Sequence, residues 1–272
     1  MIGRKLRTLF LLVLATVLLA ACQTTAPTLE PTSTPFYATT RGIDADDPSF
    51  LYFMDEYGVA TKVGVIGYAL STIKFNPDDG ALYGITRSAG NYFLIEVDLD
   101  TGVGTEVVEI TGATGPFASM AFDTDGTLYA WTENSDDLAV IDVDTGVATV
   151  LGDSGLGTAA HGMWFDDAGT LWFHNYDGYV YTIDTSDGSA TLVHELGDWT
   201  GEGMELFVDS GNFINRGDLN PDTGEVWGVS PGYGYAVASA VVRTVVDADG
   251  AELIGPAPVQ SAIAIHILAF PR

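Results

Sequence analysis

The side chains best suited to chemistry lie at equivalent positions of a repeated sequence pattern. His161 and Glu202 fall in consecutive repeats, and Glu205 follows closely. An imidazole beside carboxylates could transfer a proton or contribute to a metal site. The alternative interpretation is that these side chains form a solvated polar rim and catalyse no reaction. The candidate ligand-binding residues of this rim are Ser71, Ser119, His161, Glu202, Glu205 and Ser261.

Acidic turns form a second group of chemically interesting residues. The turn Asp98-Leu99-Asp100-Thr101-Gly102 recurs as Asp142-Val143-Asp144-Thr145-Gly146 and, more loosely, as Asp184-Thr185-Ser186-Asp187-Gly188. Several carboxylates in one tight loop could hold a hard cation such as Ca²⁺. However, Asp and Gly are also the usual residues of hairpin turns, and none of these turns has the spaced Glu of an EF-hand loop. No cofactor is certain, and Ca²⁺ is the one that the pattern suggests.

No catalytic signature is present in the sequence. There is no G-x-S-x-G elbow, no H-E-x-x-H zinc motif and no phosphate-binding loop. His174, His194 and His266 have no mutual spacing typical of metal ligands. The sequence therefore identifies no catalytic and no metal-binding residue, and an enzyme is the less favoured interpretation.

Large aromatic residues fall into two groups. One aromatic position recurs in four repeats, which favours packing between repeats: Tyr83, Tyr129, Trp172 and Trp227. Three tryptophans break the repeat and are the better candidates for ligand contact: Trp131, Trp164 and Trp199.

The N-terminus has the features of a secretory signal. A basic start at residues 4–7 precedes the apolar run Leu9 to Leu19, which is shorter than the roughly 18 residues that a membrane span needs. Leu19-Ala20-Ala21-Cys22 resembles the lipobox of bacterial lipoproteins, and the resemblance implies cleavage before Cys22 and lipidation of its thiol. An ordinary secreted protein with an accidental Cys is the alternative.

This resemblance predicts the location and the N-terminal organisation of the protein. Residues 1–21 would be the lipoprotein signal peptide. Residues 22–41 would be the lipidated Cys22 followed by a Pro- and Thr-rich linker, which has too little apolar surface to fold alone. We expect a protein anchored in the cell membrane or the outer membrane of the cell envelope, facing the extracytoplasmic side.

The composition of the chain excludes several classes of partner and of site. The 37 acidic and 10 basic residues give a formal net charge of −27, so binding to nucleic acid is excluded by repulsion. The single Cys excludes an intramolecular disulfide framework and a Cys-based zinc cluster. Hydrophobic residues make up 47% of the chain, which is typical of a folded protein.

The rest of the chain is a repeat of short strands. The closing glycines of the acidic turns, from Gly58 to Gly250, are separated by steps of 44, 44, 42 and 62 residues. A second marker keeps the same spacing, as Gly80-Ala81-Leu82-Tyr83, Gly126-Thr127-Leu128-Tyr129 and Gly169-Thr170-Leu171-Trp172. The segments between the markers alternate in polarity, which indicates about four antiparallel strands per repeat.

Four strands every 40 to 45 residues predict an all-β β-propeller over residues 42–272. The repeats resemble those of NHL-like, YVTN-like and gluconolactonase-like propellers. Five blades follow from the length, and six is the alternative, because about 20 surplus residues near Asp209 to Asp218 could be an inserted hairpin or a remnant blade. We expect the C-terminal strand, Ser261 to Phe270, to pair with an N-terminal half-blade and close the ring.

The propeller pattern also predicts which residues line the axis. The innermost strands should begin near Ile73, Met120, Met163, Met204 and Ile263. The candidate residues given above should then surround one mouth of the central channel. Gluconolactonase-like propellers hold a divalent metal there with a Glu, an Asn and an Asp, and only Glu202 matches one member of that set.

We expect the protein to be a lipid-anchored, extracytoplasmic module that binds a protein or a small molecule. A metal-dependent hydrolase or lactonase with its site at the channel mouth is one alternative. A structural protein of the cell envelope is another. A broad acidic or aromatic face without convergent metal ligands would favour the binding module.

Overall fold

The computed structural model describes residues 35–272, apart from 41, 43–45, 57–58, 87–90, 114, 158–159, 176–178, 196–214, 220–221, 223–225, 231–239, 248–249, 257–264 and 272. These residues belong to one compact unit, Thr32–Arg272. For β16 to β19 and most of β20, the backbone alone is described. Within the described ranges no helix is long and apolar enough to cross a membrane.

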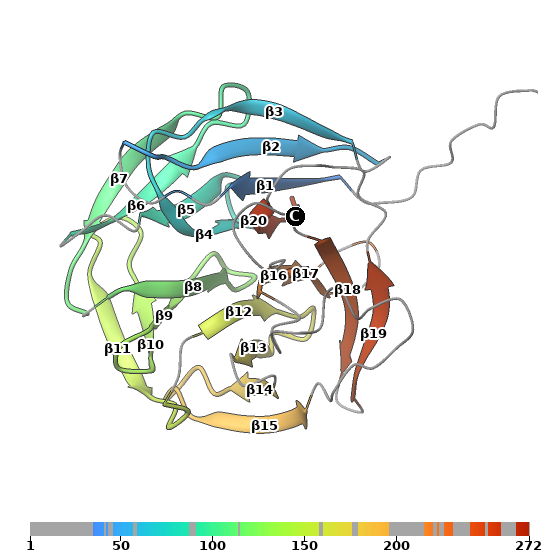
Figure 1. The fold of residues 1–272 in the computed structure, drawn as a ribbon. Helices are drawn as coiled ribbons and strands as arrows, with labels where there is room; N and C mark the ends of the chain where they lie inside the picture. The colour runs from blue at the N-terminus through green and yellow to red at the C-terminus, as the bar shows by residue number, and fades with distance from the viewer. Residues whose placement is uncertain are drawn as a thin grey trace, which may run out of the picture. The chain divides into compact units, whose positions relative to one another are not determined.

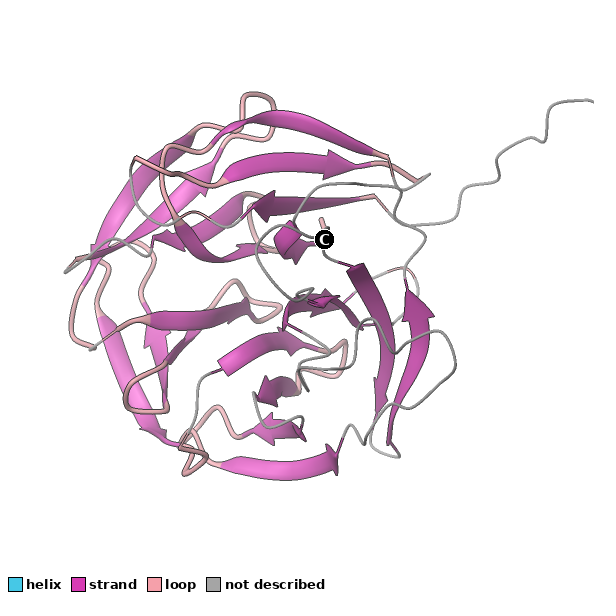
Figure 2. Cartoon of the chain, in the orientation of Figure 1, coloured by secondary structure: helices cyan, strands magenta, loops and turns pink. Residues whose placement is uncertain are grey.

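The described residues form strands and no helices (Figure 2). Their twenty strands make five antiparallel four-stranded sheets. One sheet contains β20 (Ile265–Ala269), β1 (Phe36–Thr40), β2 (Phe50–Met54) and β3 (Ala60–Val65). The next contains β4 (Leu70–Phe75), β5 (Leu82–Thr86), β6 (Tyr92–Val97) and β7 (Gly104–Ile110).

Three further sheets follow along the chain, and each sheet is named here after its innermost strand. The β8 sheet contains β8 (Phe117–Phe122), β9 (Leu128–Thr132), β10 (Asp137–Ile141) and β11 (Ala148–Asp153). The β12 sheet contains β12 (Ala160–Phe165), β13 (Leu171–Asn175), β14 (Tyr179–Ile183) and β15 (Ala190–Glu195). The β16 sheet contains β16 (Asn215–Leu219), β17 (Val226–Ser230), β18 (Ala240–Asp247) and β19 (Gly250–Pro256).

The sheets surround a common axis, and the fold is an all-β β-propeller (Figure 1). The innermost strands contact one another from sheet to sheet, as β4 with β8, β8 with β12, and β12 with β16. All six residues of β4 and all six of β8 are buried, because each inner strand has a neighbouring sheet on both faces. The outer strands are mostly exposed or half-buried instead, and in β7 only Ile110 is buried.

Each outer strand contains a β-bulge at the same place in its pairing with the strand inside it. In β7, for example, Glu106 pairs with Ile95 and Val108 pairs with Leu94, so Val107 is the extra residue. The extra residues of the five outer strands are Val63, Val107, Leu151, Val193 and Ile254. This shared irregularity shows that the repeats are equivalent in register as well as in sequence.

Adjacent sheets meet near their inner halves through pairs of aromatic rings. The ring of Tyr83 on β5 lies 5.7 Å from that of Phe122 at the end of β8. Tyr129 and Phe165 repeat this contact at 5.3 Å across the next seam. The sequence-based prediction that the recurring aromatic position packs between repeats is confirmed for these residues.

Farther out, the sheets meet backbone to backbone. The turn glycine Gly102, with a φ of 76°, brings its backbone so near to Gly64 of β3 that an added Cβ would lie 2.8 Å from the Gly64 Cα. In the same way, the backbone of Gly146 lies too near the carbonyl oxygen of Glu109 to leave room for a Cβ, and the backbone of Gly188 lies too near Gly152. We call these contacts the glycine latches. They explain why the acidic turns end in Gly: the residue needs a positive φ and must lack a side chain.

The start of the propeller differs from the sequence-based prediction. Residues 36–40 were expected in the linker, but they form β1, which pairs with β2 on one side and β20 on the other. Phe36 and Ala38 are fully buried, and the Tyr37 ring lies 5.8 Å from that of Phe75. These apolar contacts outweigh the preference of the neighbouring Pro- and Thr-rich segment for an extended, solvated chain.

The inner strand of the β16 sheet also differs from the prediction. It was expected to begin near Met204, which lies outside the described residues, whereas the strand paired with β17 is Asn215–Leu219. Part of the segment interpreted as surplus is therefore the innermost strand of this sheet. The error arose because the approach to this strand is longer than in the preceding repeats.

Candidate functional site

Two of the candidate rim residues, Ser71 and His161, occupy positions equivalent to that of Ala118, the residue before the candidate Ser119. Each lies at a β-bulge of an innermost strand: Ser71 in β4, Ala118 in β8 and His161 in β12. The register confirms that the sequence repeat brings these positions to the same end of their sheets. Whether they form a ligand site stays a prediction.

Two of the three serines of the candidate rim, Ser71 and Ser119, lie inside the protein. Ser71 is 4% exposed, and its hydroxyl donates a hydrogen bond to the carbonyl oxygen of Ile85 at 3.2 Å. That bond ties the bulge of β4 to the neighbouring strand. Ser119 is 2% exposed and pairs with Trp131 across β8 and β9.

The remaining candidates are not brought together by described contacts. The backbone of His161 belongs to β12, and its side chain is not described. Glu202, Glu205 and Ser261, as well as Cys22, lie outside the described residues. The hydrolase hypothesis depends on His161 and Glu202 and therefore stays a prediction.

Sequence reasoning missed two positions on innermost strands. Lys74 in β4 pairs with Tyr83, and Asp218 in β16 pairs with Trp227. Both are therefore the backbone pairing partners of the recurring aromatic position in their own sheets. Lys74 is 5% exposed, which is unusual for a lysine. The position opposite each recurring aromatic residue is the sequence signal that could have identified them.

Two tryptophans suggested for ligand contact are core residues. Trp131 is 0% and Trp164 is 2% exposed, so neither offers a surface to a ligand. The Trp131 ring stacks on Phe173 of the β12 sheet, with ring centres 4.1 Å apart. The prediction was wrong for these two residues because a side chain can break a sequence repeat and still fill the space between two sheets. Trp199 lies outside the described residues.

One face of the propeller collects the acidic turns. In an antiparallel four-stranded sheet, the turn between the first and second strands and the turn between the third and fourth strands lie at the same end. A Cβ added to Gly126 in one such turn would lie 2.9 Å from the Cβ of Asp78 in the turn of the preceding sheet, so these turns are neighbours. We call this end the acidic face.

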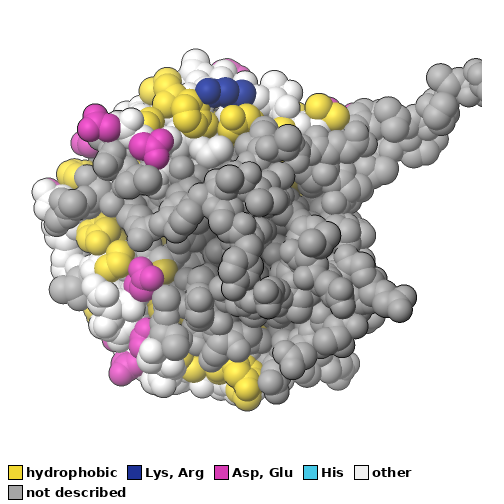
Figure 3. Space-filling model, in the orientation of Figure 1, with side chains coloured by type: hydrophobic (Ala, Val, Ile, Leu, Met, Phe, Trp, Pro, Cys, Tyr) yellow, Lys and Arg dark blue, Asp and Glu magenta, His cyan; other side chains and the backbone are white. Residues whose placement is uncertain are grey.

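The described turns of the acidic face carry two aspartates each and no Lys or Arg. The six turns are residues 76–81, 98–103, 123–127, 142–147, 166–170 and 184–189. Ten of their twelve aspartates are exposed, and Asp123 and Asp166 are half-buried. Figure 3 shows acidic side chains at several places around the periphery of the view and basic side chains at one place.

In the turns that join the two outer strands of a sheet, hydrogen bonds fix the first aspartate. Asp98 Oδ1 accepts from the backbone N–H of Thr101 at 2.7 Å and from its hydroxyl at 2.6 Å. Asp142 Oδ1 accepts from the backbone N–H of Thr145 at 2.8 Å. Hydrogen bonds to the charged form lower the pKa of both carboxyls below its ordinary value.

The inner turns are anchored in a related way. Tyr83 donates from its hydroxyl to Asp79 Oδ2 at 2.9 Å, and the indole of Trp172 donates to Asp166 Oδ2 at 2.8 Å. Burial, together with the bond to Asp79, raises the pKa of Tyr83, so its hydroxyl stays protonated and continues to donate. The carboxylates are thus held by the turns themselves. The described part of the chain contains no group of three or more His, Cys, Asp or Glu placed to hold a metal ion.

A protein family described as a repeat of unknown function, DUF6923, matches residues 28–196. This range covers more than half of the chain and contains β1 to β15. The chain belongs to the DUF6923 family. The DUF6923 repeat in this protein is therefore built from the four-stranded sheets of a β-propeller. No curated protein matches the chain.

Several solved structures are similar to this DUF6923 protein. An engineered glycoside hydrolase of family GH43 has a TM-score of 0.60 at 15% identity, with 86% of this chain and 54% of that chain covered. A chain of the nidogen/laminin complex has a TM-score of 0.55 at 12% identity, with coverages of 88% and 99%. TolB from Acinetobacter baumannii has a TM-score of 0.49 at 17% identity, with coverages of 84% and 54%.

The DUF6923 chain spans about half the length of the TolB and glycoside hydrolase chains. At these identities, the similarity to the glycoside hydrolase and to the chain of the nidogen/laminin complex shows the fold alone and leaves the activity open.

Proposed function

We propose that this protein is a binding module that uses its acidic face to hold a cationic partner. The observation that carries the proposal is the set of six turns with two aspartates each and no basic residue. The carboxylates are distributed over several sheets rather than gathered around one point. Such a surface suits an extended basic partner better than a single reacting group.

The turns are preorganised for this role. The bonds from Thr101 to Asp98 and from Thr145 to Asp142 hold the turns in one shape before any partner arrives. Asp100 and Asp144, one at the middle of each turn, are exposed to solvent. A partner would therefore meet fixed charges, and less conformational entropy would be lost on binding.

The finer architecture that we propose is a closed ring of five blades. Strand β20 supports this, because it pairs with β1 and contacts both β16 and β4. The last strand would then join the N-terminal strands in one blade, and no sheet edge would remain open between the first and last repeats. A crystal structure that contained a sixth blade would contradict this arrangement.

We further propose that the module is a lipoprotein anchored through Cys22 on the extracytoplasmic side of a membrane. The sequence Leu19-Ala20-Ala21-Cys22 supports this proposal. More than one acyl chain on the Cys would give stable attachment, since each buried CH₂ contributes about 0.8 kcal/mol. Cys22→Ser should move the protein from the membrane fraction to the soluble fraction. An unchanged membrane fraction would contradict the anchor.

Binding by the acidic face is tested with a lysine-rich peptide as the probe. The variant D100N/D144N removes two exposed charges from this face, and D46N/D47N removes two exposed charges from the loop between β1 and β2, at the other end of the sheets. We expect the first variant to bind the peptide several-fold more weakly and with a smaller salt dependence. The control should bind like the wild type.

Equal weakening in both variants would mean that only the total charge matters, and the proposal would fail. Isothermal titration calorimetry at two salt concentrations measures both quantities. A glutamate-rich peptide serves as the negative probe, because the acidic face should repel it.

A further inference from the structure

A buried polar position recurs between the sheets. Two residues after the recurring aromatic position, the second strands carry Thr39, Ile85, Trp131 and His174. All four side chains are 0% exposed, and three of them are polar. A buried polar group without a hydrogen-bond partner costs about 1–3 kcal/mol. This position therefore needs an explanation beyond hydrophobic packing.

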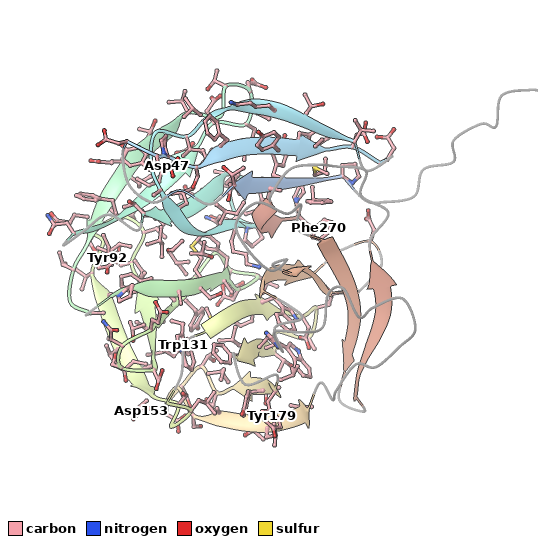
Figure 4. All side chains as sticks on the ribbon, viewed as in Figure 1. Asp47, Tyr92, Trp131, Asp153, Tyr179 and Phe270 are labelled. Carbon is pink, nitrogen blue, oxygen red and sulfur yellow. The ribbon has the colours of Figure 1, made fainter. Side chains whose placement is uncertain are left out.

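Trp131 is the clearest example of a buried polar group at this position. Its indole Nε1 is buried and has no hydrogen-bond acceptor among the described residues. The ring lies between the β8 and β12 sheets, where it stacks on Phe173 with an interplanar angle of 28° (Figure 4). The Phe173 ring carries no oxygen or nitrogen, so stacking on it does not satisfy the indole N–H. The hydroxyl of Thr39, at the equivalent position of β1, is also buried and has no partner in the described part of the chain.

Ser119 supplies a second polar group beside Trp131. The two residues are paired across β8 and β9, so their side chains lie on the same face of the sheet. Ser119 is 2% exposed, and its hydroxyl can both donate and accept a hydrogen bond. Opposite side chains in such a pair have Cβ atoms about 4.5–5.5 Å apart. A water molecule can accept from an indole N–H and also bond with a hydroxyl.

We propose that an ordered water molecule occupies the seam between the β8 and β12 sheets, next to the channel mouth. Its oxygen accepts a hydrogen bond from Trp131 Nε1, and the water also bonds with the Ser119 hydroxyl. A water suits this place because it is neutral and small and can both donate and accept. A charged ligand would need a counter-charge, and Trp131 and Ser119 provide none.

The bound water gives Ser119 a defined role. It orients the Ser119 hydroxyl from the Trp131 side and makes Ser119 a positioning residue of the seam rather than a ligand contact. This inference does not depend on the acidic face, which lies at the opposite end of the sheets from Ser119. A failure of the peptide-binding test would leave it unaffected.

The test is nuclear magnetic resonance on protein labelled with ¹⁵N at tryptophan. We expect a cross-peak between the Trp131 indole proton and a long-lived water. Trp172 is the internal control, because its indole donates directly to Asp166 at 2.8 Å. W131F and W172F assign the two signals. The absence of the water cross-peak at Trp131 would overturn the proposal.

A second variant keeps the test decisive if W131F does not fold. Ser119→Ala removes one side of the bridge and changes the side chain by a single oxygen. We expect it to shift the Trp131 indole proton signal and to weaken the water cross-peak, while the Trp172 signal stays in place. An unchanged Trp131 signal in Ser119→Ala would show that Ser119 does not take part, and the proposed bridge would be wrong.

Discussion

Neighbouring sheets of this propeller are joined in two different ways at two distances from the axis. Near the inner strands, the contact is made by side chains, as in the pair of Tyr83 and Phe122. At the outer strands, it is made by backbone, as where Gly146 lies against the Glu109 carbonyl. The inner contact depends on what the side chains add, whereas the outer contact depends on a side chain being absent.

This difference explains why the two sequence markers behave differently. The inner marker keeps a large aromatic residue but accepts Tyr or Trp, because either ring can fill the seam. The outer marker keeps Gly at positions 102, 146 and 188, because φ is positive there and the neighbouring backbone is too near for a Cβ. The repeat is therefore conserved for packing at both places, but for opposite reasons.

The largest expected effect comes from emptying an inner contact. Phe122→Ala should lower the free energy of unfolding by about 3–5 kcal/mol, because Phe122 is 4% exposed and its removal leaves a cavity against Tyr83. Urea denaturation measures this loss. Val150→Ala, at a residue that is 43% exposed on β11, is the control and should change stability by no more than about 0.5 kcal/mol. Similar losses in both variants would contradict the importance of the inner contact.

The outer contact is examined with two glycines that share a backbone conformation. Gly146 and Gly169 have φ values of 72° and 80°, but only Gly146 has a neighbour within 4 Å. Each Gly→Ala change should cost about 1–2 kcal/mol for the left-handed backbone. Gly146→Ala should cost about 1–3 kcal/mol more, because the methyl group overlaps the Glu109 carbonyl oxygen. Equal losses in the two variants would argue against a latch.

The smallest effect concerns the hydrogen bonds that hold the outer turns. Asp98, Asp142 and Asp184 have a lowered pKa in the folded protein, because Thr101, Thr145 and Ser186 donate to their carboxylates. Such groups stabilise the fold above their unfolded pKa of about 3.8, and this stabilisation is lost as the pH falls through the lower folded value.

Thermal melting between pH 7 and pH 2.5 measures this dependence. We expect the melting temperature of the wild type to fall more steeply below pH 4 than that of D98N/D142N/D184N, whose amide oxygens accept hydrogen bonds but do not titrate. Parallel curves would mean that these three carboxylates do not contribute to the acid sensitivity.

Much of the fold could be predicted because the same sequence pattern occurs several times along the chain. The alternating strands, the hairpin turns and the packing role of Tyr83 and Tyr129 all follow from local periodicity. Strand β1 was missed because its Phe36-Tyr37 copy of the inner marker has no Gly in front of it and follows a Pro-rich segment. Alignment of Phe36–Thr40 with Leu128–Thr132 would have identified it, since both five-residue segments have Tyr at the second position and Thr at the last.

The candidate site was less predictable than the fold. The sequence correctly predicted that Ser71 and His161 occupy equivalent positions. It could not predict that the Ser71 hydroxyl donates a hydrogen bond to the Ile85 carbonyl oxygen. The departure of Trp131 from the repeat was interpreted as a sign of ligand contact, whereas its ring packs on Phe173 between two sheets. Burial depends on which neighbouring sheet faces a side chain, and that information is absent from local spacing.

The bulges of the outer strands have a consequence for how these molecules behave when crowded together. A free strand edge can serve as a template on which another chain adds its own strand, and polymers grow in this way. The extra residues Val63, Val107 and Leu151 interrupt the regular spacing of donors and acceptors along three such edges. Copies held side by side on one surface would thus remain separate, even though their rims consist of β-strands.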